Sequence, residues 1–283
     1  MTSEPIPAWG EPFAADRRHE LERTSPFDGP SAMPEWLDAK GEGMTVAIID
    51  SGVDGGHPAV GGRLVRSLWV DLALEQPEVV EDADGGDVVG HGTACAGIIH
   101  SLAPEAEFVS IRVLGPDNKG KGIAFAYALE WVVDHRIPVS NLSLSSKSEA
   151  LFPTFHDLVD RAYFANCLLV CSASNYPGQD SYPSTFSSVV SVAAHDIPDP
   201  MTWFYNPRPP VEFGAWGVDV PVAWIDGRTI VATGNSFATP HITGLLTRLR
   251  SAYPNATPFE AKTLLAQSAM NVLGQERGIG RIG

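Results

Sequence analysis

Short apolar runs rich in β-branched residues recur along this chain, and several stop abruptly at small polar residues or glycine. A run that is apolar at every position is typical of a strand buried on both faces, and strands that alternate with helical patterns are typical of a parallel sheet. The predicted strands are residues 44–49, 108–114, 139–144, 168–173 and 189–193. The sequence therefore predicts an α/β fold of three layers, with a mostly parallel central sheet and helices on both faces.

Helical patterns fill the stretches between and after these runs. The predicted helices open near Gly92 and then cover 124–133, 237–251 and 258–268, the last with Thr257 as its N-cap. Before the first strand, scattered proline, charged and aromatic side chains show no sustained periodicity. We therefore expect an extended N-terminal arm over residues 1–42 and one domain over residues 43–283.

The acidic composition narrows the range of partners. The formal net charge is −15 at pH 7, from 19 basic and 34 acidic side chains. A field of that sign repels nucleic acid and anionic membranes, so we expect neither as a partner. It favours peptides that carry Lys or Arg, unless the acidity serves solubility alone. No apolar stretch reaches the roughly 18 residues that span a membrane. Three cysteines and no signal-like start favour a reducing cytoplasm.

Two residues have the chemistry of an acid–base pair. Asp50 ends an apolar run, where burial would require a partner or a metal to keep it ionised, unless it is only a turn residue that stops the strand. His91 stands between Gly90 and Gly92 at a predicted helix start, which leaves both ring nitrogens open to contact. The sequence makes His91 a candidate general base and Asp50 the carboxylate that holds it.

A nucleophile and an oxyanion donor would complete the set that serine-based amide hydrolysis requires. Ser236 follows Gly234-Asn235 and precedes Pro240, which places it at or just before a helix start, where backbone amides favour negative charge. Taken alone, that position also fits an N-capping serine. Asn175 follows another buried run, either as a turn residue or as a side-chain donor to the oxyanion.

In the order Asp, His, Asn, Ser, these segments resemble the subtilases, the subtilisin-like serine proteases. The segments that resemble the family's aspartate, histidine and serine motifs are 46–52, 90–97 and 234–244. The resemblance implies a subtilisin-like fold and a serine endopeptidase. It implies that Ser236 is the nucleophile, His91 the general base and acid, Asp50 the group that orients His91, and Asn175 a member of the oxyanion hole.

The resemblance also implies where a polypeptide substrate lies. Two extended segments would hold its backbone as an added strand, and further positions would line the pocket for the residue before the cut. The matching positions are Asn118, Lys119, Gly120, Ser143, Leu144, Ser145, Ser174, Tyr182, Ser184 and Asn235. Serine stands at 145, 174, 181 and 184, where the family more often has glycine, which would narrow this pocket or make it more polar. At 235, asparagine replaces the usual threonine or serine.

No cofactor or metal site is expected. His91 and Pro104 are 13 positions apart, where many subtilases insert a calcium-binding loop, and the acidic run 81–87 is interpreted as a solvated loop rather than a cation site. The arm is too short for the folding pro-domain of secreted subtilases. We expect part of residues 1–30 to mask the cleft of a catalytic domain formed by residues 43–283.

Three functions are compatible with these residues. The first is an intracellular serine endopeptidase, either degradative or dedicated to one precursor or leader peptide. A transpeptidase or macrocyclase on the same fold would need to keep water from the acyl-enzyme, and no long insertion is present to form a lid. A non-catalytic peptide-binding module would not need the full set of reactive groups. The endopeptidase is therefore favoured.

Overall fold

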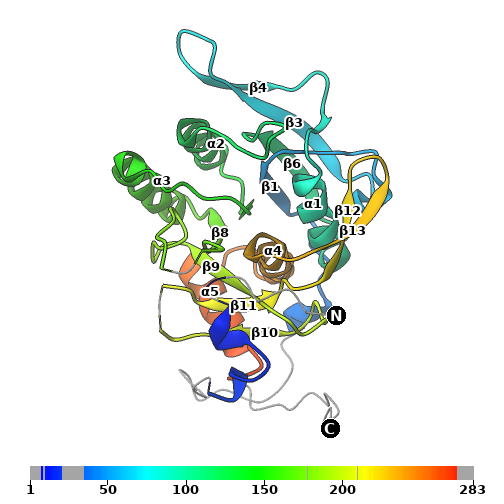
Figure 1. The fold of residues 1–283 in the computed structure, drawn as a ribbon, viewed down its shortest axis with the longest axis vertical. Coiled ribbons are helices and arrows are strands. Elements are labelled where there is room, and N and C mark those ends of the chain that lie inside the picture. Colours follow the sequence, from blue (N-terminus) through cyan, green and yellow to red (C-terminus); the bar gives the residue numbers. More distant parts are fainter. Residues whose placement is uncertain (1–7, 9, 21–34, 177, 209, 273–283) are drawn as a thin grey trace.

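The structure is a computed structural model that describes residues 8, 10–20, 35–176, 178–208 and 210–272. Within these residues a nine-stranded sheet runs through the molecule (Figure 1). In spatial order its strands are β10 (Trp203–Tyr205), β11 (Phe213–Trp216), β9 (Val190–His195), β8 (Leu168–Ser172), β7 (Val139–Leu142), β1 (Thr45–Asp50), β6 (Glu107–Arg112), β3 (Leu64–Asp71) and β4 (Glu78–Glu81). Only the outer pairs β10–β11 and β3–β4 are antiparallel. The predicted mostly parallel sheet is therefore confirmed.

Helices cover both faces of this sheet (Figure 1). One face carries α1 (His91–Leu102), α4 (Asn235–Ala252) and α5 (Pro258–Gln267). The other face carries α2 (Gly122–Asp134) and α3 (Phe152–Phe164). The predicted three-layer α/β architecture is confirmed.

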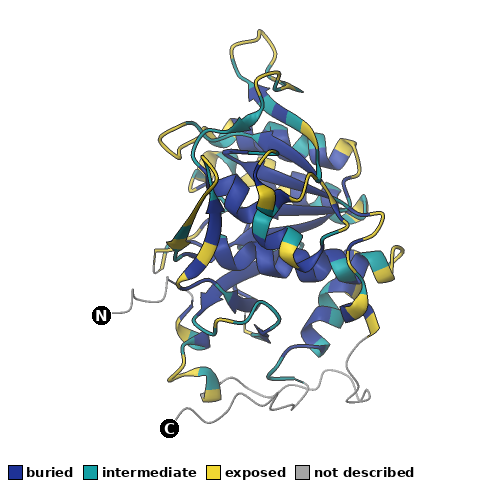
Figure 2. Cartoon of the chain, turned by 90° about the vertical axis from the view of Figure 1, so that its right-hand side faces the viewer, coloured by how far each residue is buried: buried dark blue, intermediate teal, exposed yellow. Residues whose placement is uncertain are grey.

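The side chains of β1 show why its run is apolar at every position. Val46 and Ile48 join the core cluster under α1, α4 and α5, whereas Ala47 and Ile49 join the cluster under α2 and α3. Successive side chains of a strand point to opposite faces, so a strand covered on both faces needs apolar residues throughout. Figure 2 shows the buried residues concentrated in the sheet and its adjoining helices, with exposed residues at the loops.

Several elements were not predicted. They are β3, β4, β10, β11 and α3, the pair β2 (Gly52–Val53) and β5 (Gly86–Asp87), and the hairpin of β12 (Val220–Trp224) and β13 (Arg228–Ala232). Short 3₁₀ turns lie at η1 (Glu11–Phe13), η2 (Arg18–Glu20), η3 (Glu35–Asp38), η4 (Pro58–Val60) and η5 (Glu149–Leu151). No helix in the described parts of the chain is both long enough and apolar enough to cross a membrane.

Three strands end earlier than predicted, and this matters for the site. β6 ends at Arg112 rather than at 114, β7 at Leu142 rather than at 144, and β8 at Ser172 rather than at 173. Apolar residues such as Leu114, Leu144 and Ala173 follow soon after these strand ends, which is why the sequence overestimates the lengths of the strands. Residues 143–145 and 173–175 are thereby released as loops at the carboxyl edge of the sheet.

Part of the N-terminal arm packs against the domain. The Phe13 side chain has no exposed surface and lies over Gly214, where a Cβ would stand 2.6 Å from its ring. Ala173 and Ala193 belong to the same apolar cluster. Phe13 therefore attaches this part of the arm to the core of the domain.

We expect Phe13→Ala to lower the free energy of unfolding by about 3–5 kcal/mol, because it empties a fully buried site. Phe164→Ala is the matched control, since 84% of the Phe164 side chain is exposed, and its effect should stay within about 0.5 kcal/mol. Urea-induced unfolding measures both. Equal losses in the two variants would contradict the packing of the arm.

Candidate active site

The carboxyl ends of the parallel strands meet at one edge of the sheet, and the loops that leave them surround a pocket of about 720 Å³. These loops follow β6, β7 and β8. Helices α1 and α4 begin at the same edge, so His91 and Ser236 both line the pocket. The sheet thereby brings together residues that lie far apart in the sequence.

Asp50 and His91 form a buried hydrogen-bonded pair. Asp50 is the last residue of β1 and has no exposed surface, and His91 is the first residue of α1. The Nδ1 atom of His91 lies 2.9 Å from both carboxylate oxygens of Asp50. The backbone N–H of Ser51 also donates to Asp50 Oδ1, at 2.7 Å. With Nδ1 engaged by the carboxylate, Nε2 is the nitrogen left for acid–base chemistry.

Two glycines allow α1 to begin so close to β1. Gly90 has a φ of 115°, and a Cβ there would lie 2.6 Å from the ring of Trp224. A Cβ at Gly92 would lie 2.0 Å from the carbonyl oxygen of Gly52. A side chain at either position would push the start of the helix, and His91 with it, away from β1.

A second carboxylate, Asp87, holds the loop before His91. Its Oδ1 accepts hydrogen bonds from Ser51 Oγ and from two backbone N–H groups, and its Oδ2 accepts from the N–H and hydroxyl of Thr93, all at 2.7–2.9 Å. Burial lowers the pKa of His91, but the charge and hydrogen bond of Asp50 and the charge of Asp87 outweigh burial. The pKa of His91 is therefore raised above its ordinary value.

Asp87→Asn should move the acid limb of the kcat/KM profile to lower pH. Only neutral imidazole can accept a proton, so with a raised pKa for His91 we expect the wild-type limb to lie above about pH 6.5, the ordinary histidine value. Removing the Asp87 charge lowers that pKa. Asp84→Asn, an exposed change in the same run, should leave the limb in place. A limb that stays fixed or rises in Asp87→Asn would contradict this electrostatic role.

The acidic run 81–87 does not act as one solvated loop. Asp84 is exposed, but Asp82 accepts a hydrogen bond from Arg112 Nε at 3.0 Å, and Asp87 is held by its five donors. Glu81 also accepts a hydrogen bond from Arg66 Nε, at 3.1 Å. The expected solvated loop therefore describes only part of the run, because three of its carboxylates have protein donors.

Ser236 lies in the first turn of α4, which begins at Asn235 with Gly234 as its N-cap. Pro240, expected in the first turn, lies one turn further inside the helix. Proline has no N–H to donate to the carbonyl four residues earlier. The Ser143 hydroxyl donates to that Ser236 carbonyl instead, at 2.8 Å. A residue of the loop after β7 thus stabilises the helix start that carries the candidate nucleophile.

Asn175 lines the same pocket as Ser236, with its amide nitrogen near the Ser236 hydroxyl. Its Oδ1 accepts the backbone N–H of Asn235 at 2.9 Å, which assigns Nδ2 as the end of the amide available to the pocket. Asn175 Nδ2 and Ser236 Oγ lie 3.7 and 3.3 Å from the point where a Cβ on Gly234 would stand. An N–H donor beside a nucleophilic oxygen is the arrangement that stabilises an oxyanion.

Asn235 turns its side chain away from the pocket and has no exposed surface. Its Oδ1 accepts the N–H of Ala194 at 2.9 Å, and its Nδ2 donates to the carbonyls of Ala8 at 2.8 Å and Ser174 at 3.0 Å. The resemblance implied contact with substrate. In the structure the residue instead ties the start of α4 to β9, to the loop after β8 and to the arm.

Most of the other implied substrate positions line the pocket. They are Asn118, Lys119, Gly120, Ser143, Leu144, Ser145 and Ser174. The lining residues that were not predicted are Val113, Leu114, Lys121, Gly122, Phe125, Ser146, Lys147, Ser148, Ser172, Ala173 and Tyr176. The described arm residues are not among the lining residues. The rest of the expected masking segment, residues 1–7, 9 and 21–30, lies outside the described residues.

Tyr182 and Ser184 are not among the lining residues. Ser184 is buried, and its hydroxyl lies 2.8 Å from the hydroxyl of Ser181 in a hydrogen bond. The backbone of Tyr182 pairs with Ser146 in both directions. Two of the four serines expected to narrow the pocket therefore bond to each other, while the other two line it.

Cys95 lies behind the Asp50–His91 pair, with its Sγ 3.9 Å from Asp50 Oδ2. Burial, and then the charge of Asp50, raises the pKa of this thiol and keeps it protonated. The ligand atoms of these three residues lie within 4.8 Å of one another, the one such cluster in the described part of the chain. A metal ion there would occupy the carboxylate and the imidazole, and would remove them from acid–base chemistry.

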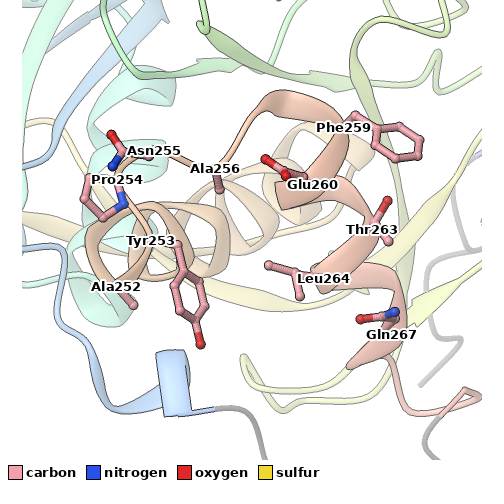
Figure 3. Close-up of a pocket in the computed structure, with 10 residues that line it drawn as sticks. All are labelled: Ala252, Tyr253, Pro254, Asn255, Ala256, Phe259, Glu260, Thr263, Leu264 and Gln267. Atoms are coloured by element: carbon pink, nitrogen blue, oxygen red, sulfur yellow. The ribbon is translucent and has the colours of Figure 1, made fainter. Parts of the chain in front are cut away.

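A second hollow of about 740 Å³ lies between the end of α4 and α5 (Figure 3). Tyr253, Phe259 and Leu264 contribute to its lining, and Glu260 is its one carboxylate. Glu260 accepts hydrogen bonds from the N–H and hydroxyl of Thr257 in the capping box of α5. Because its one carboxylate is engaged by the capping box and its lining contains no histidine, we assign the chemistry to the first pocket.

Known proteins resemble this chain over most of its length. The Subtilase family model matches residues 41–281. The thermostable alkaline protease of Halalkalibacterium halodurans is 30% identical over 239 residues, which cover 81% of this chain but only 63% of that protein. The intracellular serine protease of Paenibacillus polymyxa is 27% identical over 231 residues, 76% of this chain and 69% of that protein. The crystal structure of a cold adapted subtilisin-like serine proteinase matches with a TM-score of 0.70 and 26% identity, covering 89% of this chain and 90% of that chain.

Proposed function

This chain belongs to the subtilase family of serine peptidases, and we propose that it hydrolyses internal peptide bonds of polypeptides through an acyl-enzyme on Ser236. His91 serves as general base and acid, Asp50 orients His91, and Asn175 donates its amide to the oxyanion. The observation that carries the proposal is the buried 2.9 Å contact between His91 and Asp50, beside a pocket that Ser236 lines.

The proposed reaction begins as His91 accepts the hydroxyl proton of Ser236 and Oγ attacks the carbonyl carbon of the substrate. The carbonyl oxygen becomes an oxyanion, which Asn175 Nδ2 and the positive end of α4 stabilise. Asp50 stabilises the imidazolium until it gives its proton to the leaving amine. Water then attacks the acyl-enzyme by the same sequence and releases the acid.

We further infer that the enzyme cleaves a restricted set of sequences, as a protease dedicated to one precursor or leader peptide would. The support is the lining of the pocket, which includes Ser145 and Ser174 at positions where the resemblance to the family implies glycine. A wall of polar groups discriminates against side chains that leave those groups unpaired. In this proposal residues 43–283 form the catalytic domain and residues 1–42 the arm.

A reducing compartment fits the cysteines. Cys95, Cys167 and Cys171 are all buried free thiols, which would persist where thiols are kept reduced. One relative is an intracellular serine protease by its name, and another, from Bacillus subtilis, is a minor extracellular protease. We therefore propose a cytoplasmic location, and we base it on the free thiols rather than on the names of the relatives.

Incubation with a peptide library and mass spectrometry of the products tests the proposed function. Fragments cut at internal bonds would support it if the two fragments together weigh one water more than the intact peptide. These fragments should be absent with Ser236→Ala. Cyclised or ligated products would indicate a transpeptidase instead. Peptides bound but returned unchanged would indicate a binding module.

A further inference from the structure

Three of the five lysines in the whole chain line the active-site pocket. They are Lys119, Lys121 and Lys147. No Asp or Glu belongs to the lining residues of this pocket, although the chain contains 34 acidic side chains and has a net charge of −15. The pocket is therefore a local positive site on an acidic molecule.

Two of these lysines form no salt bridge with any of the residues that the structure describes. Lys119 Nζ lies 4.0 Å from Asp117 Oδ2, so its charge is partly offset. Lys121 and Lys147 are exposed. In the described parts of the chain, neither has a carboxylate oxygen within the 4.0 Å of a salt bridge. Both ammonium groups thus remain available to a ligand.

The loops that carry these two lysines meet at the pocket. Lys121 is the N-cap of α2, in the loop after β6, and Lys147 lies in the loop after β7. Ser146 Oγ stands 3.0 Å from the point where a Cβ on Gly122 would lie, so the neighbours of the two lysines are in contact. Lys147 Nζ also lies 4.6 Å from the ring centroid of Tyr176, the residue after the candidate oxyanion donor.

The start of α2 adds to the same positive potential. Gly122 lines the pocket, the N-cap Lys121 makes no side-chain capping bond, and the first turn contains no acidic residue. The partial positive charge of this helix end is therefore unopposed by a capping carboxylate. This partial charge adds to the positive potential of the two lysines, which carry the proposed preference.

We propose that this enzyme prefers substrates that carry Asp or Glu close to the scissile bond, and that Lys121 and Lys147 determine this preference. The proposal rests on the peptidase function proposed above. The net charge opposes an acidic peptide at long range, but solvent ions screen that field beyond about 8 Å at physiological ionic strength. A carboxylate inside the pocket meets the lysines at shorter range. The preference is thus the reverse of the Lys or Arg preference that net charge alone predicts.

The test uses one cleaved peptide in which Glu or Gln is placed at each position around the scissile bond. At the preferred position kcat/KM should be higher for Glu than for Gln, by about two- to fivefold for each lysine, and added salt should reduce this ratio. In the double variant Lys121→Gln/Lys147→Gln the ratio should approach one. Lys40→Gln removes an equal charge from an exposed lysine outside the pocket and should keep the wild-type ratio.

The outcomes separate this proposal from the peptidase function itself. Equal kcat/KM for the Glu and Gln peptides at every position, in an enzyme that cleaves both, would overturn the acidic preference and leave the peptidase function standing. Failure to cleave any peptide would overturn the peptidase function. In that case the affinity of Ser236→Ala for the same peptides is measured by calorimetry. Tighter binding of the Glu peptides would support the acidic preference, and equal binding would overturn it.

Discussion

Ser236→Ala is expected to lower kcat on a cleaved peptide by about 10⁶-fold, the loss that removal of the nucleophile causes in subtilisin. Alanine has no atom that can carry the acyl group, so only the slow direct attack of water remains. KM should change little, because the hydroxyl group contributes mainly to the transition state. Peptide hydrolysis at saturating substrate, followed by mass spectrometry, measures the loss.

Ser101→Ala is the matched control for this variant. Ser101 is an exposed serine near the end of α1, and its hydroxyl bonds to the carbonyl of Ile98. The control should keep wild-type kcat and KM. If Ser236→Ala retained a substantial fraction of the wild-type kcat, with its melting temperature unchanged, Ser236 could not be the nucleophile.

Asn175→Ala should lower kcat by about 10²–10³-fold, which is the cost of removing the corresponding type of oxyanion donor in subtilisin. The reason is local. With Oδ1 held by the N–H of Asn235 at 2.9 Å, Nδ2 is the group that can donate to charge developing on the substrate oxygen beside Ser236. Because that charge exists only in the transition state, KM should stay nearly constant.

Asn175→Asp separates this role from a structural one. Aspartate keeps an oxygen for the N–H of Asn235 and so preserves the start of α4, but it removes the donor and adds a negative charge. We expect at least the loss seen in Asn175→Ala. Recovery of activity in Asn175→Asp would mean that the residue acts only by holding Asn235.

The architecture was predictable wherever burial of a strand on both faces produces a run of apolar residues in the sequence. β1, β6, β8 and β9 are short, mostly apolar runs, because each lies between two layers of helices; β7 is also buried but contains the polar residues Ser140 and Asn141. β3, which lies between β6 and the edge strand β4, was missed because its burial is irregular, with Val65 exposed. The helix α3 has Phe155, Leu158, Val159 and Ala162 buried at helical spacing, a pattern present in the sequence but not used.

The central residues of the site were predictable because each stands at the end of a strand or the start of a helix. Asp50 ends β1, and His91 begins α1. The partners of Asn235 were not predictable, since its amide bonds to Ala8 and Ala194, which are distant in the sequence. The convergence of Lys121 and Lys147 likewise depends on which loops the sheet places together.

The central claim is that Ser236, His91 and Asp50 act as one catalytic set, and covalent labelling tests it most directly. The wild-type protein is treated with a fluorophosphonate, and the modified residue is mapped by mass spectrometry. We expect one phosphonyl group per chain, on Ser236, formed much more slowly in His91→Ala and Asp50→Ala. Labelling of a different serine, or labelling of Ser236 at an unchanged rate in His91→Ala, would contradict it.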